Sequence, residues 1–365
     1  MEDDLLVDMA VSKIRLVYIT KNFPPLPRVS GTLQYAYRLC TELSKKTDLT
    51  VIALGNLEEK DRKKKTGIKT IRVGQPFVLN AALEARKLNP DVVVFGSGLS
   101  SSLALLPALL SMRLALLGIP FVLHQLTEFN SEIPPALLGA GTAFVDKVIC
   151  TNRHLTKYFF QACGKKAEML LPGFKIPALP KAKKSSIIKI GFFGHYHFVK
   201  GPDRLVGAFK ELNLENAGLV FDGIDYEGGK MQKMLLKEAK KRKDIMVYID
   251  SPKYWQLLIE CDFVALPFRA SGSVLGVSMA AVEAMAYGKP VVGGNVSVLS
   301  SIIENGKNGF LVETDKELGD AIKKLATDAK LREKMGRNAR KTAEQKFDIN
   351  FSSKEFLEIC KRLLR

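Results

Sequence analysis

Short apolar runs alternate with segments of helical spacing along the whole 365-residue chain. This alternation indicates a parallel α/β architecture, because a helix must return the chain to the same edge of the sheet before the next parallel strand begins. The predicted strands of the first half are Ile14–Ile19, Leu49–Ala53, Thr70–Val73, Val92–Phe95, Pro120–His124 and Lys147–Thr151. Those of the second half are Ile187–Phe193, Gly218–Asp222, Ile245–Ile249, Phe263–Leu266, Val291–Gly294 and Gly309–Val312.

The length of the chain favours two domains, because one hydrophobic core rarely organises so many residues. A stretch rich in Pro and Lys, Leu171–Ser185, separates the two sets of strands and is typical of a linker. We therefore predict one α/β domain at residues 1–178, a second at 185–347 and a terminal helical segment at 348–365. A cleft between two such halves is a common place for a ligand.

One carboxylate lies in an otherwise uncharged predicted helix. From Gly276 to Gly288 the residues are small or apolar apart from Ser278, Glu283 and Tyr287, which is the composition of a buried helix. An ionised carboxylate in such a place needs a partner, and the hydroxyl groups of a ligand are one candidate. The helix follows a predicted strand and a Gly/Ser loop, so its start lies at the carboxyl edge of the sheet, where anions bind.

Two further loops are predicted at the same edge. The loop after the strand Ile187–Phe193 carries His195, His197 and Lys200 before a helix, so backbone N–H groups and the ammonium group could hold a phosphate. The alternatives are a solvated loop lysine and histidines with surface or capping roles. In the first half, Gly31 lies at or just before a helix start. His124 ends a strand, where a structural hydrogen bond is the alternative to a functional role.

The five cysteines are scattered and form no CxxC pair, which indicates a reducing compartment without a disulfide framework or zinc cluster. The first residues are acidic, so no signal peptide is expected there. The apolar segment Leu99–Leu123 is long enough to cross a bilayer. Pro107, Arg113 and Gly118 interrupt it, however, so we expect a buried or surface-docked helix followed by a separate strand.

The formal net charge of +17 indicates attraction to anions. Basic clusters lie near Lys60, at Lys181–Lys184 and around Lys240. They are interpreted either as solvated surfaces, with the Lys/Glu enrichment of thermophiles, or as contacts to an anionic membrane or substrate. Nucleic acid is the least favoured partner, because no cluster interleaves aromatic residues and no recognised binding motif is present.

Together the motifs resemble those of the family 4 glycosyltransferases, retaining enzymes with the GT-B fold. In the first half the matching segments are YITKNFPPLPRVSGTLQYAYRLCTELSKK, LNPDVVVFGSG, VICTNRHLTKYF and LPGF. In the second half they are FFGHYHFVKG, similar to the family's phosphate loop, PFRASGSVLGVSMAAVEAMAYGKPVV, similar to its E-x7-E segment, and IIENGKNGFLV. The resemblance runs from about Ile14 to the terminal helix.

The resemblance implies two facing Rossmann-like domains, a nucleotide-sugar in the cleft and a terminal helix that packs back on the first domain. It implies that the donor diphosphate contacts Lys200, His195, Gly31 and the backbone of Gly276 and Val277. Glu283 would hold the ribose, and His124 would lie beside the transferred sugar as the catalytic residue. No metal is expected, because cationic side chains and helix starts neutralise the leaving diphosphate.

The chain departs from the family pattern at two positions. Leu275 stands eight residues before Glu283, where the first glutamate of the motif would contact the donor sugar, and leucine cannot accept a hydrogen bond. His195 stands in place of an arginine and lacks its bidentate fork.

We expect a cytoplasmic hexosyltransferase that uses a UDP- or GDP-sugar and a sugar, lipid or small-molecule acceptor. Peripheral association with an anionic membrane is one of the interpretations that its charge leaves open. One alternative is a GT-B-fold nucleotide-binding or regulatory protein with weak or no transfer. Another is a GT-B enzyme that catalyses phosphorolysis or epimerisation.

Overall fold

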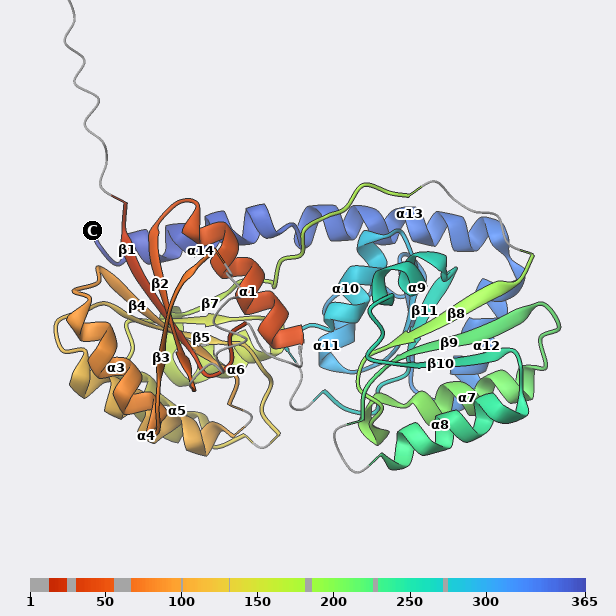
Figure 1. The fold of residues 1–365 in the computed structure, drawn as a ribbon, viewed down its shortest axis with the longest axis horizontal. Helices are drawn as coiled ribbons and strands as arrows, with labels where there is room; N and C mark the ends of the chain where they lie inside the picture. Colours follow the sequence, from red (N-terminus) through yellow and green to blue (C-terminus); the bar gives the residue numbers. More distant parts are fainter. Residues whose placement is uncertain are drawn as a thin grey trace, which may run out of the picture.

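The computed structural model describes residues 13–24, 31–55, 67–99, 101–130, 132–180, 186–225, 229–271 and 275–365. Two parallel sheets, each covered by helices on both faces, lie side by side along the long axis of the molecule (Figure 1). The basic clusters near Lys60 and at Lys181–Lys184 lie outside the described residues.

The first sheet has seven strands in the order β3-β2-β1-β4-β5-β6-β7. Its inner strands are buried on both faces, which explains why they read as continuous apolar runs. The chain order reverses between β1 and β4, which makes their carboxyl ends a place where a ligand can enter. The strands are β1 Arg15–Thr20, β2 Asp48–Leu54, β3 Lys69–Val73, β4 Val92–Ser97, β5 Phe121–Gln125, β6 Lys147–Cys150 and β7 Ala167–Met169.

Different helices cover the two faces of this sheet. Helix α1 (Gly31–Ser44) packs with the terminal helix α14 (Ile349–Arg362) on the face whose core continues into the second domain. The opposite face has its own core beneath α3 (Phe77–Lys87), α4 (Ser102–Ala115), α5 (Pro135–Thr142) and α6 (Arg153–Cys163), followed by the short 3-10 helix η1 (Gly164–Lys166).

The second sheet has six strands in the order β10-β9-β8-β11-β12-β13. The strands are β8 Ile188–Phe193, β9 Ala217–Gly223, β10 Ile245–Ile249, β11 Phe263–Leu266, β12 Val291–Gly294 and β13 Gly309–Val312. The helices are η2 Phe198–Lys200, α7 Pro202–Leu212, α8 Lys230–Lys241, α9 Tyr254–Glu260, α10 Met279–Ala286, α11 Ser297–Ser300, α12 Asp315–Thr327 and α13 Ala329–Lys346.

The chain crosses back to the first domain between α13 and α14, at the break predicted near Asp348. There the Phe174 N–H donates to the Phe347 carbonyl at 2.6 Å, and the Ile349 N–H donates to the Phe174 carbonyl at 3.1 Å. Helix α14 then runs along α1 and ends with Arg362 paired to Glu168 at 2.5 Å (Figure 1). The terminal helix therefore packs back on the first domain, as the resemblance implies.

The predicted strands are confirmed to within two residues at each end. Strand β7 was not predicted, because Ala167–Met169 is too short to give a periodic pattern. The helix expected from Gly276 begins only at Met279. The preceding residues instead contact the first domain: Leu275 forms an antiparallel bridge with Thr127, and the Gly276 N–H donates to the Leu126 carbonyl at 3.0 Å.

The apolar segment Leu99–Leu123 divides as predicted into a 14-residue helix, α4, and the separate strand β5. None of the helices in the described part of the chain combines the length and apolar character that crossing a bilayer requires.

Candidate functional site

A cavity of about 310 Å³ lies between the two domains. The start of α1 forms one wall, and loops at the carboxyl ends of the second sheet form the others. The lining residues are Gly31, Thr32, Gln34, Phe192, Phe193, Gly194, His195, Lys200, Asp222, Gly223, Ile224, Asp250, Ser251, Tyr254, Trp255, Phe268, Leu275, Val277, Ser278, Met279, Ala280 and Glu283.

The cavity brings together six of the predicted site residues, namely Gly31, His195, Lys200, Leu275, Val277 and Glu283. Gly276 and His124 are not part of the lining. The Gly276 N–H is directed at the Leu126 carbonyl and its carbonyl at Asn152, so neither backbone group points to the cavity in this structure. The roles predicted for these residues stay predictions.

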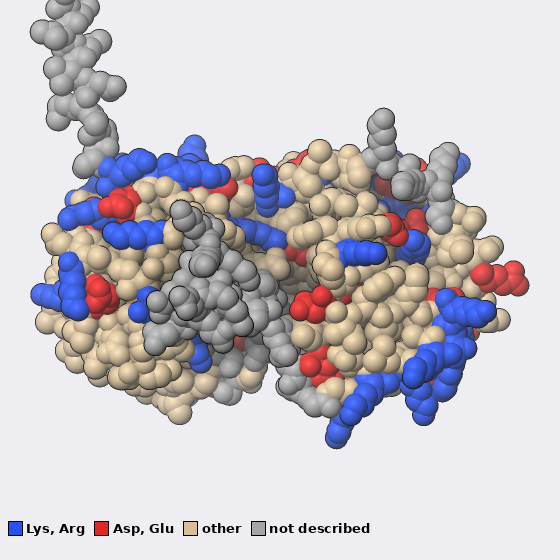
Figure 2. Space-filling view, viewed as in Figure 1, with Lys and Arg blue, Asp and Glu red and all other residues tan. Residues whose placement is uncertain are grey.

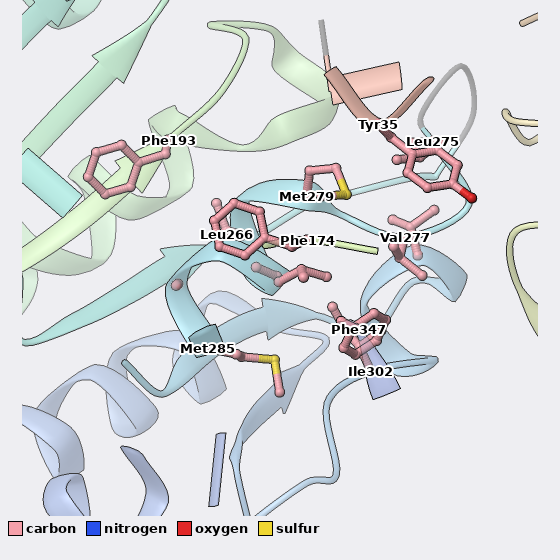
Figure 3. Packing of buried hydrophobic residues seen from close by; sticks show 14 of the residues in the cluster. Tyr35, Phe174, Phe193, Leu266, Leu275, Val277, Met279, Met285, Ile302 and Phe347 are labelled. Atoms are coloured by element: carbon pink, nitrogen blue, oxygen red, sulfur yellow. The ribbon is translucent and has the colours of Figure 1, made fainter. Parts of the chain in front are cut away.

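Two helix starts meet at the cavity. Gly31 begins α1, and a Cβ placed on it would lie 3.4 Å from Cβ of Met279, the first residue of α10. Figure 3 shows Tyr35 of α1 in the same apolar cluster as Leu275, Val277 and Met279 of the second domain. Because the start of a helix carries about half a unit of positive charge, the two starts together favour an anion between them.

Glu283 is buried and already has two protein partners. Its Oε1 accepts hydrogen bonds from Nη1 and Nη2 of Arg38, each at 3.2 Å, and its Oε2 accepts one from the Tyr254 hydroxyl at 2.6 Å. Burial raises the pKa of the Glu283 carboxyl, while Arg38 acts in the opposite direction. Since Arg38 belongs to α1, this contact is also an ion pair between the domains.

Lys200 adds a cationic side chain to the lining of the cavity. It ends η2, and its Nζ lies 4.1 Å from the centre of the Phe268 ring. Burial lowers the pKa of its ammonium group to about 7. The next residue must be glycine: Gly201 has φ of +68°, and a Cβ there would lie 2.2 Å from the Pro267 carbonyl oxygen.

The two loop histidines differ in role. His197 accepts a hydrogen bond from the Val199 N–H at 3.1 Å through Nδ1, which is the capping role considered from the sequence. His195 lines the cavity beside Lys200. Burial, with smaller effects of Lys200 and His197, lowers the pKa of His195, so its ring is neutral at pH 7 and has one N–H to donate.

His124 is fully buried in an aromatic environment. Its Nδ1 lies 3.1 Å from the Tyr18 hydroxyl oxygen, and its ring packs against Tyr35 and against Phe356 of α14. Burial lowers the pKa of His124 to about 3. The ring is therefore neutral across the physiological range in this arrangement. Among the described residues, nothing forms a hydrogen bond with its Nε2.

A second buried carboxylate, Glu128, also connects the domains. Its Oε1 accepts a hydrogen bond from Asn152 Nδ2 at 2.5 Å, and its Oε2 accepts one from the Ser297 hydroxyl at 2.7 Å. The same Asn152 amide donates to the Gly276 carbonyl at 2.6 Å. Sequence reasoning missed Glu128, although its place just after the strand Pro120–His124 could have indicated a carboxyl-edge residue.

The prediction that the site needs no metal ion stays a prediction. Within the described residues, no group of three or more His, Cys, Asp or Glu side chains is placed to hold a metal ion. The cationic groups at the cavity are instead Lys200 and, behind Glu283, Arg38.

Comparison with known proteins shows what parts of the chain are similar to. Residues 178–342 match the family described as glycosyl transferases group 1. An uncharacterized glycosyltransferase of Methanocaldococcus jannaschii is 26% identical over 208 residues, which are 56% of this chain and 56% of that protein. The chain therefore matches little more than half the length of this curated relative.

Solved structures share the whole fold. Anabaena HepE in complex with UDP and glucose has a TM-score of 0.77 at 17% identity, over 95% of this chain and 99% of HepE. A glycosyltransferase from Rickettsia africae has a TM-score of 0.77 at 20% identity, over 97% of this chain and 99% of that one. The predicted fold class is confirmed: the chain has the GT-B fold, and its second domain matches the glycosyl transferases group 1.

Proposed function

We propose that the protein is a glycosyltransferase that moves a hexose from a nucleotide-sugar to an acceptor. The observation that carries this proposal is the arrangement of charge around one cavity. Lys200 and the starts of α1 and α10 form a site for a diphosphate, and the Glu283 carboxylate lies on α10 beside it. A nucleoside diphosphate has these two features, an anionic diphosphate joined to a ribose with two hydroxyl groups.

The leaving diphosphate would be neutralised without a metal. Lys200 supplies a charge, His195 supplies a neutral N–H, and the helix starts supply oriented dipoles. Bound phosphate oxygens would raise the pKa of Lys200 from about 7 and hold its proton, because an anion favours the charged form. We propose a UDP- or GDP-sugar as donor, and the UDP bound to HepE supports the uridine nucleotide.

Glu283 can hold the ribose without losing its protein partners. A carboxylate has about four lone-pair sites, and Arg38 and Tyr254 occupy three of them. One site on Oε2 is left for a ribose hydroxyl. Arg38 would then keep the buried carboxylate ionised, which is the state that accepts hydrogen bonds from both hydroxyl and phenol.

The sugar end of the site is less polar. Leu275 lines the cavity where a glutamate is expected from the resemblance, so the donor sugar would be held by other groups. We keep the predictions of family 4, of a retaining reaction in the cytoplasm, of His124 beside the sugar, and of a sugar, lipid or small-molecule acceptor on the first domain. Retention would require the acceptor to approach the face of the sugar from which the diphosphate leaves.

The alternative is a nucleotide-binding protein of the same fold without transfer. Leu275 and the burial of His124 favour it, since both reduce polar contacts to a sugar. A panel of UDP-, GDP- and ADP-sugars separates the two, with binding measured by calorimetry and nucleoside diphosphate release measured over time. Release with one donor supports the transferase. Tight nucleotide binding without release from any donor, with and without candidate acceptors, supports the alternative.

A further inference from the structure

Among the residues of α4 whose burial is described, those most exposed to solvent are all apolar. Leu103, Leu110, Leu114 and Leu117, the last just beyond the helix, are exposed by 61%, 40%, 64% and 61%. The one charged residue of this helix, Arg113, is held at its edge by Asp146 at 2.9 Å and by the Ile119 carbonyl at 3.1 Å. A helix on the surface of a soluble domain normally presents charged residues on its solvent-facing side.

Helices α3 and α5, which pack against α4, and α6, which packs against α5, also expose apolar side chains. Helix α3 exposes Leu79 and Leu83, α5 exposes Leu137, and α6 exposes Phe160. We call these side chains, with those of α4, the leucine face. Figure 2 shows a broad area without Lys, Arg, Asp or Glu at the lower left, where Figure 1 places α4 and α5. Monomeric soluble proteins rarely expose large contiguous apolar patches, and such patches often mark an interaction site.

Basic side chains border the leucine face on two sides. At the end of α4, the Arg86 guanidinium donates to the carbonyls of Ala115 and Leu117 at 3.0 and 3.2 Å. On α6, the exposed Lys157 precedes Phe160 by three residues and therefore shares its side of the helix. An apolar centre with a cationic border, on a chain of net charge +17, is complementary to a layer of anionic lipid.

We propose that the leucine face docks the protein on the surface of an anionic bilayer. The leucines would enter the interface between headgroups and acyl chains, and Arg86 and Lys157 would meet the lipid phosphates. A second copy of the chain fits less well, because a twofold contact of this face with itself would place two cationic borders against each other. This docking goes beyond the proposed function and does not require sugar transfer.

Flotation with lipid vesicles tests the proposal. The full-length protein is expected to float with vesicles of phosphatidylcholine mixed with phosphatidylglycerol, less with phosphatidylcholine alone, and less again as salt is raised. The double variant Leu114→Glu/Leu117→Glu should lose binding by at least about tenfold, because two carboxylates would have to enter the interface. The matched control is Phe351→Glu/Leu364→Glu, which places the same charges on exposed apolar positions in α14 and just beyond its end.

The proposal is overturned if the unmodified protein floats with no vesicle, or if the Leu114/Leu117 variant floats as well as the control. It is also overturned if the protein is a dimer that the Leu114/Leu117 changes dissociate, since a second copy would then cover the face. Thermal unfolding confirms that both variants are folded. UDP binding, measured on the same samples, reports separately on the proposed function, so failure of one proposal leaves the other intact.

Discussion

The two domains present different chemistry to the cavity they share. The second domain contributes Lys200, His195 and Glu283, whose polar groups line the cavity directly. The first domain contributes mainly the start of α1, and it keeps His124 buried under Tyr35 and Phe356. Under the proposed function, the nucleotide end of the site is therefore already assembled. The sugar end depends on residues, such as Leu275 and His124, that offer little polarity in this arrangement.

The largest effect is expected at Lys200, the cation for the diphosphate. Lys200→Ala should weaken UDP binding by about 10- to 100-fold, since a charge-assisted hydrogen bond to a phosphate is lost. Lys237→Ala, on the exposed side of α8, removes the same charge from the same domain and should leave the affinity unchanged. Calorimetric titration with UDP measures both. Equal affinities for the two variants would show that the nucleotide end is not where we place it.

Substitutions at Glu283 and Leu275 compare the proposed nucleotide end of the site with the proposed sugar end. Both residues lie in the same segment of the chain. Glu283→Ala should lower UDP affinity by about tenfold, because the ribose loses its acceptor. Leu275→Ala should keep UDP affinity within about twofold. It should nevertheless reduce the free energy of unfolding by about 2 to 5 kcal/mol, as a buried leucine is truncated. Calorimetry and thermal unfolding give the two quantities; loss of UDP affinity in the Leu275 variant instead would reverse our assignment of the two ends.

The pH dependence of donor binding tests the ionisation of Lys200. Its ammonium loses a proton above about pH 7, because burial lowers the pKa, so affinity for UDP-glucose should fall as pH rises. The decrease between about pH 6 and about pH 8 should approach tenfold. UDP-glucose is the better probe, since its diphosphate does not titrate in this range. Lys200→Arg should give a flatter profile, because arginine stays protonated. An unmodified protein with a flat profile would contradict this ionisation.

The smallest effect is expected at Tyr254, which donates to Glu283. Tyr254→Phe removes one hydrogen bond to the carboxylate and should raise the pKa of Glu283 further, since that bond favours the ionised form. Relative to the unmodified protein, the affinity of this variant for UDP-glucose should be lower by a few-fold at neutral pH and by more as the pH is lowered, when its Glu283 carboxyl becomes protonated. The ratio of the two affinities, measured from about pH 5 to about pH 8, separates this effect from the titration of Lys200, which both proteins share. A ratio that does not change with pH would contradict the ionised carboxylate as the ribose acceptor.

Much of the fold follows from the sequence because both sheets are buried. Parallel strands covered on both faces must be apolar throughout, so runs such as Val92–Phe95 and Phe263–Leu266 are visible without a structure. Gly276–Ser278 was predicted as helix because it begins a run of mostly small or apolar residues. Contacts with Leu126 and Asn152 of the other domain hold Gly276 outside the helix, and no local pattern reports such contacts.

The site was predictable only in part for the same reason. Glu283 stood out as a charge in an apolar helix, and the phosphate loop with Lys200 could be recognised by resemblance. Arg38, the partner of Glu283, is 245 residues away in the sequence, so the spacing of apolar residues could not predict this contact. The burial of His124 depends on Phe356 in the terminal helix. The position of His124 at the end of a strand could not predict this contact.

A crystal structure of the protein with bound UDP tests the central claim most directly. We expect the diphosphate beside Lys200 Nζ and the start of α10, and the ribose hydroxyls within hydrogen-bond distance of the Glu283 carboxylate. UDP bound elsewhere on the molecule, or bound in the cavity with its ribose away from Glu283, would contradict the assignment of this cavity as a nucleotide-sugar site.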